Sequence, residues 1–391
     1  MRPGATDVAI IGGGVIGCAV AHYLAKQGAR VTIIERSVIG GGASSTNTGA
    51  IAMATKKPGP ALDLAMASQL LYPGLAAELG MDVEYVVEGN LIIAESETEA
   101  AYLEDMAAAQ RTAGIPSEIV SAARCRELNP LLEGRVLAGL HCSTDAQANP
   151  FKVTQGFARA AQNAGARILA HTAVESIDVA AGRVTGVRTS QGMVRADWIV
   201  NAAGAHAADI GAMVGVAHDV VPRRGQVLVL EATDGLPGMR VSGAGQLLAK
   251  HGGASGGSAA SASVAPSYLS KPLSGTVLLG STNEFVGFDT RTTPGMLAEI
   301  CRRVTAVMPQ LGKLNVLRSW AGLRPYSSKG ALLGAAGGPA GYAVATGHGG
   351  DGVALAPITG DYLAEYIARD GKDCGLPEFL GRIKTRVARA Q

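Results

Sequence analysis

The stretch DVAIIGGGVIGCAVAHYLAKQGARVTIIE, residues 7–35, decides the fold class. It opens with an apolar run of strand length, Asp7–Ile11, passes through a glycine-rich turn into a helical pattern, Val15–Gly28, and closes with a second apolar run, Arg30–Glu35. Strand-length runs on either side of a helical pattern predict a strand–helix–strand unit, with Gly28 as the residue that ends the helix.

The turn between the first strand and the helix reads GGGVIG and satisfies the G-x-G-x-x-G pattern of dinucleotide-binding proteins. Gly12 would permit the tight turn, Gly14 would let the backbone approach a pyrophosphate, and Gly17 would let the helix pack closely on the strand. The helix N-terminus, at Val15 and Ile16, would offer free N–H groups and a partial positive charge to the phosphates.

An acidic residue, Glu35, ends the second strand close to the spacing of about 20 residues that ribose recognition requires. Its carboxylate would accept hydrogen bonds from both ribose hydroxyls and repel a 2′-phosphate. The adjoining Arg36 is also expected to contact the cofactor. The alternative, a glycine-rich turn that binds nothing, leaves this acid at this spacing unexplained. The sequence therefore predicts dinucleotide binding.

Composition narrows the class of protein. The 391 residues suffice for two or three domain-sized units with a buried core. Lys and Arg number 34 against 32 Asp and Glu, and only 4% of residues are aromatic, so nucleic acid is not expected as a partner. A hydrophobic content of 47% argues against intrinsic disorder.

The five cysteines are scattered and form no C-x-x-C pair, so neither a disulfide framework nor a metal site is expected. The apolar stretch Val8–Leu24 is interrupted by four glycines, which suits a buried strand, turn and helix better than a membrane span. Because no signal peptide is recognisable either, we expect a cytoplasmic protein without an integral membrane segment.

The rest of the chain alternates between short strands and helices. Helices are expected at Leu62–Leu79, Glu97–Ala113, Pro294–Met308 and Ile358–Arg369. Strands are expected at Glu84–Ala94, with a turn at Glu88-Gly89-Asn90, and at Arg167–Thr172, Val174–Val179, Arg183–Thr189, Met193–Val200, Gln226–Glu231, Thr276–Gly280 and Tyr342–Ala345. Arg223 and Arg224 are expected to flank a strand at a domain junction, and Gly252–Ser263, almost entirely Gly, Ala and Ser, to form a flexible loop.

Three further segments carry a family resemblance: GGGASSTNTGA at 40–50, DWIVNAAG at 197–204, and GHGGDGV at 347–353 followed by LAPITG at 355–360. In this order they resemble segments of the FAD-dependent D-amino-acid oxidase, glycine oxidase and sarcosine oxidase family. The resemblance implies an α/β (α+β) fold, in which a Rossmann-like FAD-binding domain of the glutathione-reductase type is interleaved with an antiparallel-sheet substrate domain.

The resemblance also implies a division of the chain and a set of cofactor contacts. The FAD-binding domain would comprise residues 1–85, 146–218 and 335–391, and the substrate domain residues 86–145 and 219–334, with the flexible loop at 252–263. Beyond the first turn, FAD contacts are expected at Gly42, Ala43, Ser44, Ser45, Asn47, Thr48, Gly49, Ala50, Val174, Ala203, Gly204, Gly349, Gly350, Asp351 and Gly352.

The turn at 347–352 has a physical rationale as a flavin contact. A glycine-rich turn that opens a helix collects unpaired N–H groups and the positive end of the helix dipole, and these would stabilise the negative charge of a reduced flavin. Asp351 departs from the neutral or basic residue that is more usual in this turn, and is interpreted as a helix cap. His348 is expected to position backbone or pack on the flavin, with general base as the less favoured role.

The substrate site is expected around WAGLRPY at 320–326, which resembles the family's Gly-Leu-Arg-Pro motif. The resemblance assigns the substrate carboxylate to Arg324, whose planar guanidinium suits two parallel hydrogen bonds. Tyr268, placed at the edge of the substrate-domain sheet, would close over the substrate or be an ordinary sheet tyrosine. Glu284 is a candidate for reading the substrate amine or side chain. The alternative for Arg324 is a surface arginine before a proline.

The function that the resemblance implies is oxidation of the C–N bond of a D-amino acid or secondary-amine amino acid, of the D-proline, hydroxyproline, opine or sarcosine type. FAD is expected to be non-covalent, because YSSK at 326–329 lacks a cysteine. Residues 97–130 and 145–152 look most similar to β subunits of heteromeric opine oxidases, D-hydroxyproline and proline dehydrogenases and sarcosine oxidase, in which partner subunits accept the electrons. The alternatives are a stand-alone oxidase that produces hydrogen peroxide and a non-catalytic flavin-binding assembly subunit.

Overall fold

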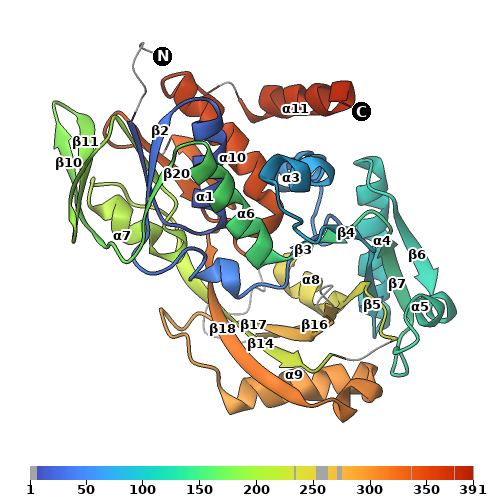
Figure 1. Ribbon diagram of the computed structural model, residues 1–391. Coiled ribbons are helices and arrows are strands. Elements are labelled where there is room, and N and C mark those ends of the chain that lie inside the picture. Colours follow the sequence, from blue (N-terminus) through green and yellow to red (C-terminus); the bar gives the residue numbers. More distant parts are fainter. Residues whose placement is uncertain are drawn as a thin grey trace.

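A computed structural model describes residues 7–232, 235–251, 263–270, 275–335, 337–373 and 375–390. Its first layer is a six-stranded sheet with the strand order β19-β20-β13-β1-β2-β9 (Figure 1). Five of these strands run parallel and β19 joins antiparallel at the edge. The strands are β1 (Asp7–Ile11), β2 (Arg30–Ile34), β9 (Arg167–Leu169), β13 (Trp198–Asn201), β19 (Leu332–Ala335) and β20 (Tyr342–Thr346).

Both faces of this sheet are covered, which explains why its central strands are almost continuously apolar. Helices α1 (Val15–Lys26), α6 (Pro150–Asn163) and α10 (Gly352–Ala368) pack together on one side (Figure 1). On the other side lies an antiparallel three-stranded sheet, β10 (Val174–Ala180), β11 (Arg183–Thr189) and β12 (Gly192–Arg195). Its Ile177, Val184 and Val187 share a core with Ile11 and Ile199.

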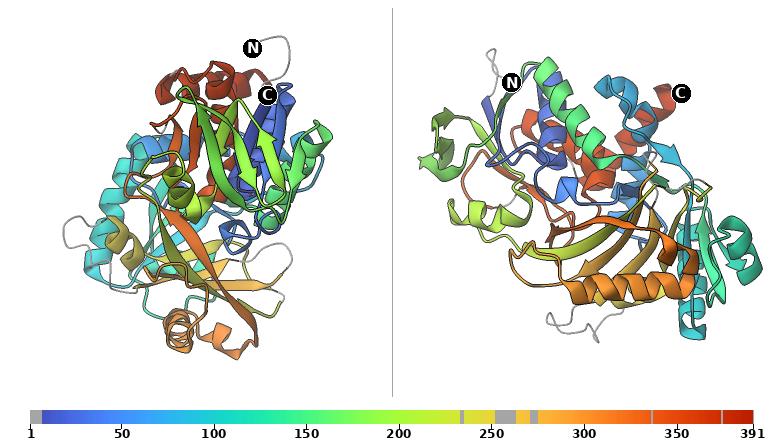
Figure 2. Two further views of the ribbon diagram at one scale, coloured as in Figure 1. Left: turned by 90° about the vertical axis from the view of Figure 1, so that its left-hand side faces the viewer. Right: turned by 60° about the horizontal axis from the view of Figure 1, so that its bottom comes forward.

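The second layer is an eight-stranded sheet with the order β18-β14-β17-β16-β15-β5-β7-β6, antiparallel except where β15 meets β5. Helix α9 (Pro294–Val307) packs on its outer face, as the right-hand view of Figure 2 shows, burying Ile300 and Val304 against Leu228 and Leu279. The strands are β5 (Asn90–Ala94), β6 (Ser117–Ser121), β7 (Ala138–Cys142), β14 (Val221–Leu230), β15 (Arg240–Gly243), β16 (Ser263–Ser270), β17 (Val277–Asn283) and β18 (Val316–Tyr326).

The remaining elements connect or flank the two large sheets. They are the strands β3 (Ala50–Ile51), β4 (Val86–Val87) and β8 (Ala146–Gln147), the helices α2 (Pro60–Gln69), α3 (Tyr72–Leu79), α4 (Glu97–Thr112), α5 (Ala122–Leu128), α7 (Ala207–Ala212), α8 (Ala244–His251) and α11 (Leu376–Ala390), and the 3₁₀ turns η1 (Ala43–Ser45), η2 (Gly204–His206) and η3 (Pro309–Lys313). No helix among the described residues is long and apolar enough to cross a membrane.

Several element predictions need correction. The helix expected at 62–79 is two helices, α2 and α3. The turn expected at 88–90 within 84–94 is confirmed: it separates β4 from β5, which pair with different partners. The strand expected at 193–200 is also two, because β12 ends at Arg195 in the small sheet and β13 begins at Trp198 in the six-stranded sheet. Strand β14 begins at Val221, so Arg223 and Arg224 lie inside it rather than beside it. The loop residues 252–262 lie outside the described residues.

Helix α10 differs most from expectation, since it begins at Gly352 and runs through Pro357. A proline inside a helix leaves the carbonyl four residues earlier without its N–H partner. Here that carbonyl, Val353, accepts from the Tyr72 hydroxyl at 2.5 Å, and the next, Ala354, accepts from the Ser68 hydroxyl at 2.6 Å. The two hydroxyls therefore let the helix start directly after the 347–352 turn.

The sheets draw on interleaved parts of the chain. Residues 90–142 and 221–326 supply the eight-stranded sheet, whereas the six-stranded sheet takes strands from 7–34, 167–201 and 332–346. Strand β19 starts at Leu332, before the boundary expected at residue 335. The division into two discontinuous domains at the expected boundaries stays a proposal.

Candidate active site

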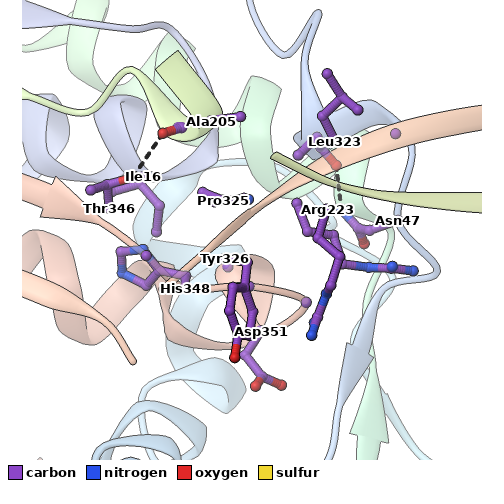
Figure 3. A pocket seen from close by; sticks show the side chains of 18 of the residues that line it. Ile16, Asn47, Ala205, Arg223, Leu323, Pro325, Tyr326, Thr346, His348 and Asp351 are labelled. Atoms are coloured by element: carbon purple, nitrogen blue, oxygen red, sulfur yellow. Dashed lines mark hydrogen bonds between the residues drawn. The ribbon is translucent and has the colours of Figure 1, made fainter. Parts of the chain in front are cut away.

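One large cavity, of about 2300 Å³, is lined by residues of both large sheets. It extends from the end of β1 and the start of α1 to β14, β17 and β18. Figure 3 shows part of the lining, with Ile16 of α1, Arg223 of β14 and Tyr326 of β18. Small-molecule sites usually occupy roughly 300–1,000 Å³. The cavity therefore has room for a dinucleotide together with a substrate.

The glycines of the first turn have the geometry that dinucleotide binding requires. Gly12 has φ +112°, a conformation that favours glycine, and a Cβ atom there would collide with the Ala202 carbonyl. Gly17 does not line the cavity; a Cβ there would collide with the Gly12 carbonyl, so this glycine permits the close packing of helix on strand. At Gly14 a Cβ would lie 3.1 Å from Ser44 Oγ, at the start of α1.

The small polar segment 42–50 lies against this helix N-terminus. Ser44 Oγ accepts a hydrogen bond from the Val15 N–H at 2.9 Å, and so occupies one of the unpaired donors of α1. Asn47 Oδ1 accepts from the Gly49 N–H at 2.7 Å and fixes the turn that leads into β3. Of the expected contacts in this segment, Ser45 alone does not line the cavity; Gly42, Ala43, Ser44, Asn47, Thr48, Gly49 and Ala50 all do.

Glu35 lies at the cavity wall in a fixed orientation. Its two carboxylate oxygens accept hydrogen bonds from the Gly13 and Ser37 N–H groups, each at 2.8 Å. The carboxylate is thereby held at the end of β2, where the ribose of a bound dinucleotide is expected. The cavity wall continues through the expected contacts Arg36, Val174, Ala203 and Gly204.

At the opposite end, the 347–352 turn leads from β20 into α10. Gly349 has φ +56°, and its N–H donates to the Pro325 carbonyl at 2.9 Å, which fixes the turn next to β18. Asp351 stands at the N-cap position, but its side chain makes no capping hydrogen bond, so the capping interpretation is wrong. Its carboxylate instead pairs with the buried Lys56 ammonium at 2.9 Å.

Arg324 lies on β18 with its guanidinium against the end of β17. It donates to the Thr282 carbonyl at 2.9 Å, to Asn283 Oδ1 at 3.2 Å, and to Ser281 Oγ. These acceptors are all neutral, and within the described part of the chain Arg324 forms no ion pair. Burial, together with the nearby Arg223 and Arg240, lowers the pKa of Arg324 to about 10.

A family model described as "FAD dependent oxidoreductase", named DAO, matches residues 7–366. The chain belongs to the DAO family. Among its relatives, glycine oxidase of Geobacillus kaustophilus is 31% identical over 93% of each chain. Hydrogen cyanide synthase subunit HcnC of Pseudomonas protegens is 26% identical over 96% of this chain and 95% of its own.

Solved structures agree with this DAO membership. The crystal structure of glycine oxidase from Geobacillus kaustophilus superposes with a TM-score of 0.84 at 28% identity, covering 96% of this chain and 98% of that one. The crystal structure of L-proline dehydrogenase from P. horikoshii gives a TM-score of 0.83 at 25% identity, covering 96% and 97%. The protein is therefore a FAD-dependent oxidoreductase, and its α/β fold is that of the DAO family.

The residues present fit FAD at both ends of the cavity. At one end, the glycines at 12 and 14 leave the start of α1 open beside Glu35. At the other, the N-terminus of α10 borders the cavity, and the buried His348 Nδ1 has no hydrogen-bond partner among the described residues. We expect the pyrophosphate at α1 and the flavin at the 347–352 turn.

His348 does not have the properties of a base that works at neutral pH. Its imidazole is 5% exposed, and Nε2 lies 3.0 Å from Thr359 Oγ1 on α10. Burial lowers its pKa to about 4. This placement suits a residue that positions the backbone or packs on the flavin.

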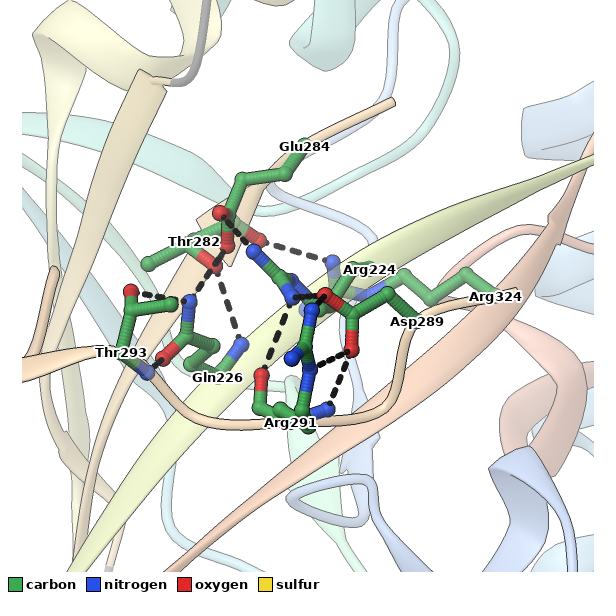
Figure 4. A network of polar contacts seen from close by, with 8 residues as sticks. All are labelled: Arg224, Gln226, Thr282, Glu284, Asp289, Arg291, Thr293 and Arg324. Atoms are coloured by element: carbon green, nitrogen blue, oxygen red, sulfur yellow. Dashed lines mark hydrogen bonds and ion pairs between the residues drawn. The ribbon is translucent and has the colours of Figure 1, made fainter. Parts of the chain in front are cut away.

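Glu284 is placed outside the residues that line the cavity. Figure 4 shows it in a buried network, where its carboxylate accepts from Arg224 Nη2 at 2.6 Å, Gln226 Nε2 at 2.8 Å and Thr282 Oγ1 at 2.5 Å. Because the Thr282 carbonyl also accepts a hydrogen bond from Arg324, the network holds the strand segment against which Arg324 lies. The geometry thus does not support a role for Glu284 in binding the substrate amine or side chain.

Tyr268 lies on β16, which is an interior strand between β17 and β15, so its expected place at the sheet edge is wrong. Among the cavity-lining residues that the sequence did not indicate are Lys56, Arg223 and Arg240. Residues 223, 225 and 227 all line the cavity with the period of two that a strand imposes, so extending β14 to Val221 would have identified Arg223. Lys56 and Arg240 belong to no recognisable pattern.

Proposed function

We propose that this DAO-family enzyme oxidises the C–N bond of a D-amino acid or secondary-amine amino acid, and that Arg324 binds the substrate carboxylate. The observation that carries the proposal is the Arg324 guanidinium, which lines the cavity beside the 347–352 turn and has only neutral partners. A partly buried cation without an ionic partner is stabilised when an anion pairs with it. A substrate carboxylate supplies that anion.

The residues of the chain act here by positioning. FAD, when bound, would accept a hydride from the substrate α-carbon. The substrate loses that hydride and a proton from its nitrogen. Water then hydrolyses an acyclic imine to a 2-oxo acid and ammonia or an amine, whereas a cyclic imine persists. Arg324, held by the Ser281–Asn283 segment, would fix the carboxylate so that the α-carbon faces the 347–352 turn.

The test is anaerobic reduction of the purified holoenzyme by D-proline, D-hydroxyproline, N-methylglycine, glycine and an opine, followed by the loss of flavin absorbance. We expect at least one of them to bleach the flavin. Arg324→Lys should retain FAD and lower the second-order rate constant of reduction about 10²-fold or more, because a point charge replaces the two-pronged contact. Bleaching by none of the amines, or reduction at an unchanged rate in Arg324→Lys, would overturn the proposal.

We further propose that the chain is the catalytic subunit of a heteromeric dehydrogenase. The relative named as a synthase subunit supports this, whereas the relatives named glycine oxidase support a stand-alone oxidase. Admitting oxygen to the substrate-reduced enzyme separates the two: slow recolouring with co-purified chains indicates a subunit, and rapid recolouring with hydrogen peroxide indicates an oxidase. A cytoplasmic location stays a prediction. FAD is proposed to be non-covalent, since no cysteine is found among the described cavity-lining residues.

A further inference from the structure

The charges near Arg324 are unequally balanced. The groups close enough to affect its pKa are Arg223 and Arg240, which lower it, and Asp351 and Glu284, which raise it. Both carboxylates are engaged elsewhere: Asp351 pairs with Lys56 at 2.9 Å, and Glu284 pairs with Arg224 at 2.6 Å. Arg324 and the neighbouring Arg223 both line the cavity here, neither has an ion pair among the described residues, and a single substrate carboxylate would compensate only one of them.

Arg223 is placed to share a ligand with Arg324. The two residues are directly opposite each other in the β14–β18 ladder, so their side chains leave the same face of the sheet. Arg324 Nε and Arg223 Nη2 each lie close to the 347–352 turn, 3.8 Å and 3.9 Å from where a Cβ would stand on Gly350 and Gly349. Two neighbouring cations therefore face the same part of the cavity.

The surroundings of Arg223 leave its charge available. Its guanidinium lies over the Tyr326 ring, 4.7 Å from the ring centre, and Figure 3 shows both side chains at the cavity beside Asp351. Within the described part of the chain Arg223 has no ion-pair partner, and its Nε has no hydrogen-bond acceptor. A cation held in this way by an aromatic face is oriented but not neutralised.

Resting on the proposed function, we propose that the preferred substrate is an amino acid with a second carboxylate, and that Arg223 binds that second carboxylate while Arg324 binds the first. An acidic side chain and an N-carboxyalkyl substituent both supply this chemistry. The proposal makes Arg223 a specificity residue. It should favour dicarboxylates over monocarboxylates, and it should not contribute to the binding of the carboxylate that both kinds of ligand share.

The test uses inert ligands, so that binding is measured apart from turnover. The oxidised holoenzyme is titrated with propionate against succinate and with butyrate against glutarate at constant ionic strength, by flavin absorbance and by the shift of the unfolding midpoint. In at least one pair we expect the dicarboxylate to bind about tenfold tighter or more. Arg223→Gln should bring this ratio close to one and change the monocarboxylate Kd by less than about threefold.

A matched control is Arg318→Gln, because Arg318 lies on β18 over the Trp320 ring at 5.0 Å but does not line the cavity. It should leave both affinities unchanged. Arg223→Lys, which keeps the charge, should retain part of the preference, and flavin content checks that each variant folds. Equal affinities for both members of every pair in the unaltered protein would overturn the inference. So would an equal loss for monocarboxylates and dicarboxylates in Arg223→Gln, which would assign Arg223 to the cofactor.

Two amine pairs then distinguish the source of the second carboxylate. Faster flavin reduction by iminodiacetate than by N-methylglycine indicates an N-substituent, and faster reduction by D-aspartate than by D-alanine indicates a side chain. If dicarboxylates bind tighter but no amine reduces the flavin, the proposed function fails, and only the binding of two carboxylates by Arg324 and Arg223 stands. If amines reduce the flavin but dicarboxylates have no advantage, the inference fails and the proposed function stands.

Discussion

Gly225 illustrates how a missing side chain serves the site, because the Arg324 guanidinium occupies the space where its Cβ would lie. Gly225→Ala is expected to displace Arg324 and to raise the Kd for propionate about tenfold or more, with the flavin content preserved. Titration of flavin absorbance measures this. Gly295→Ala is the control, since a Cβ at the start of α9 meets nothing within 4 Å. Similar affinities in the two variants would show that Arg324 does not need this space.

His348 should limit stability in mild acid. Its pKa is about 4 in the folded protein and about 6.5 when unfolded, so the unfolded state binds the proton more readily. The folded state is therefore penalised as pH falls below about 6.5. Between pH 7 and pH 5 the free energy of unfolding should fall by about 2 kcal/mol more in the unaltered protein than in His348→Gln. Urea unfolding of both at the two pH values checks this, and parallel pH profiles would contradict it.

Motif residues and unpatterned residues differ in what the sequence alone could predict. The roles of the glycines at 12, 14 and 17 could be predicted, because each position in the motif has a known backbone requirement that glycine meets: a tight turn, close approach of a pyrophosphate, and close packing of the helix on the strand. Arg324 was found through a family motif, but its partners Ser281 and Thr282 lie on another strand, and their contact depends on the pairing of β17 with β14. Lys56 meets Asp351 across 295 positions of sequence. No local pattern could indicate such a pair.

At the scale of elements, α10 offers a coupled test of how a helix tolerates an internal proline. Tyr72→Phe removes the hydroxyl that donates a hydrogen bond to the Val353 carbonyl, and should lower the free energy of unfolding by about 1–3 kcal/mol. Pro357→Ala restores an N–H to the same carbonyl. In the Pro357→Ala background, Tyr72→Phe should therefore cost clearly less. Chemical denaturation of the four proteins gives the coupling, and equal costs in both backgrounds would refute the compensation.

Elements with strong local patterns were predicted well, and those governed by tertiary pairing were not. The expected helix at Glu97–Ala113 is α4 to within a residue, because a Ser96 cap and a long run of helix formers define it. The run 193–200 looks continuous in sequence, yet its halves join different sheets. Helix α10 was expected too late because Pro357 is a helix breaker by local rules, and the hydroxyls that compensate it belong to α2 and α3.

For the whole molecule, the cavity joins residues of both large sheets, so FAD should stabilise the complete chain. Free FAD at about 100 times its Kd should raise the free energy of unfolding by about 2.7 kcal/mol and the unfolding midpoint of FAD-depleted protein by about 3 °C. A thermal scan against FAD concentration measures the shift. Gly14→Val, which fills the approach to α1, should show none; a shift of equal size there would place the cofactor elsewhere.

The strand order of the six-stranded sheet determines when the sheet can be completed during translation. Strand β1 lies next to β13, and β20 completes that side before α10 follows, although residues 7 and 342 are far apart in the chain. At about 5–20 residues per second, a ribosome needs roughly 15–70 s between these two strands. During that interval the nascent chain lacks the 347–352 turn and α10, where the flavin is proposed to bind. Cofactor binding is therefore one of the last steps in the biosynthesis of this protein, although β1 and β2 can already pair early.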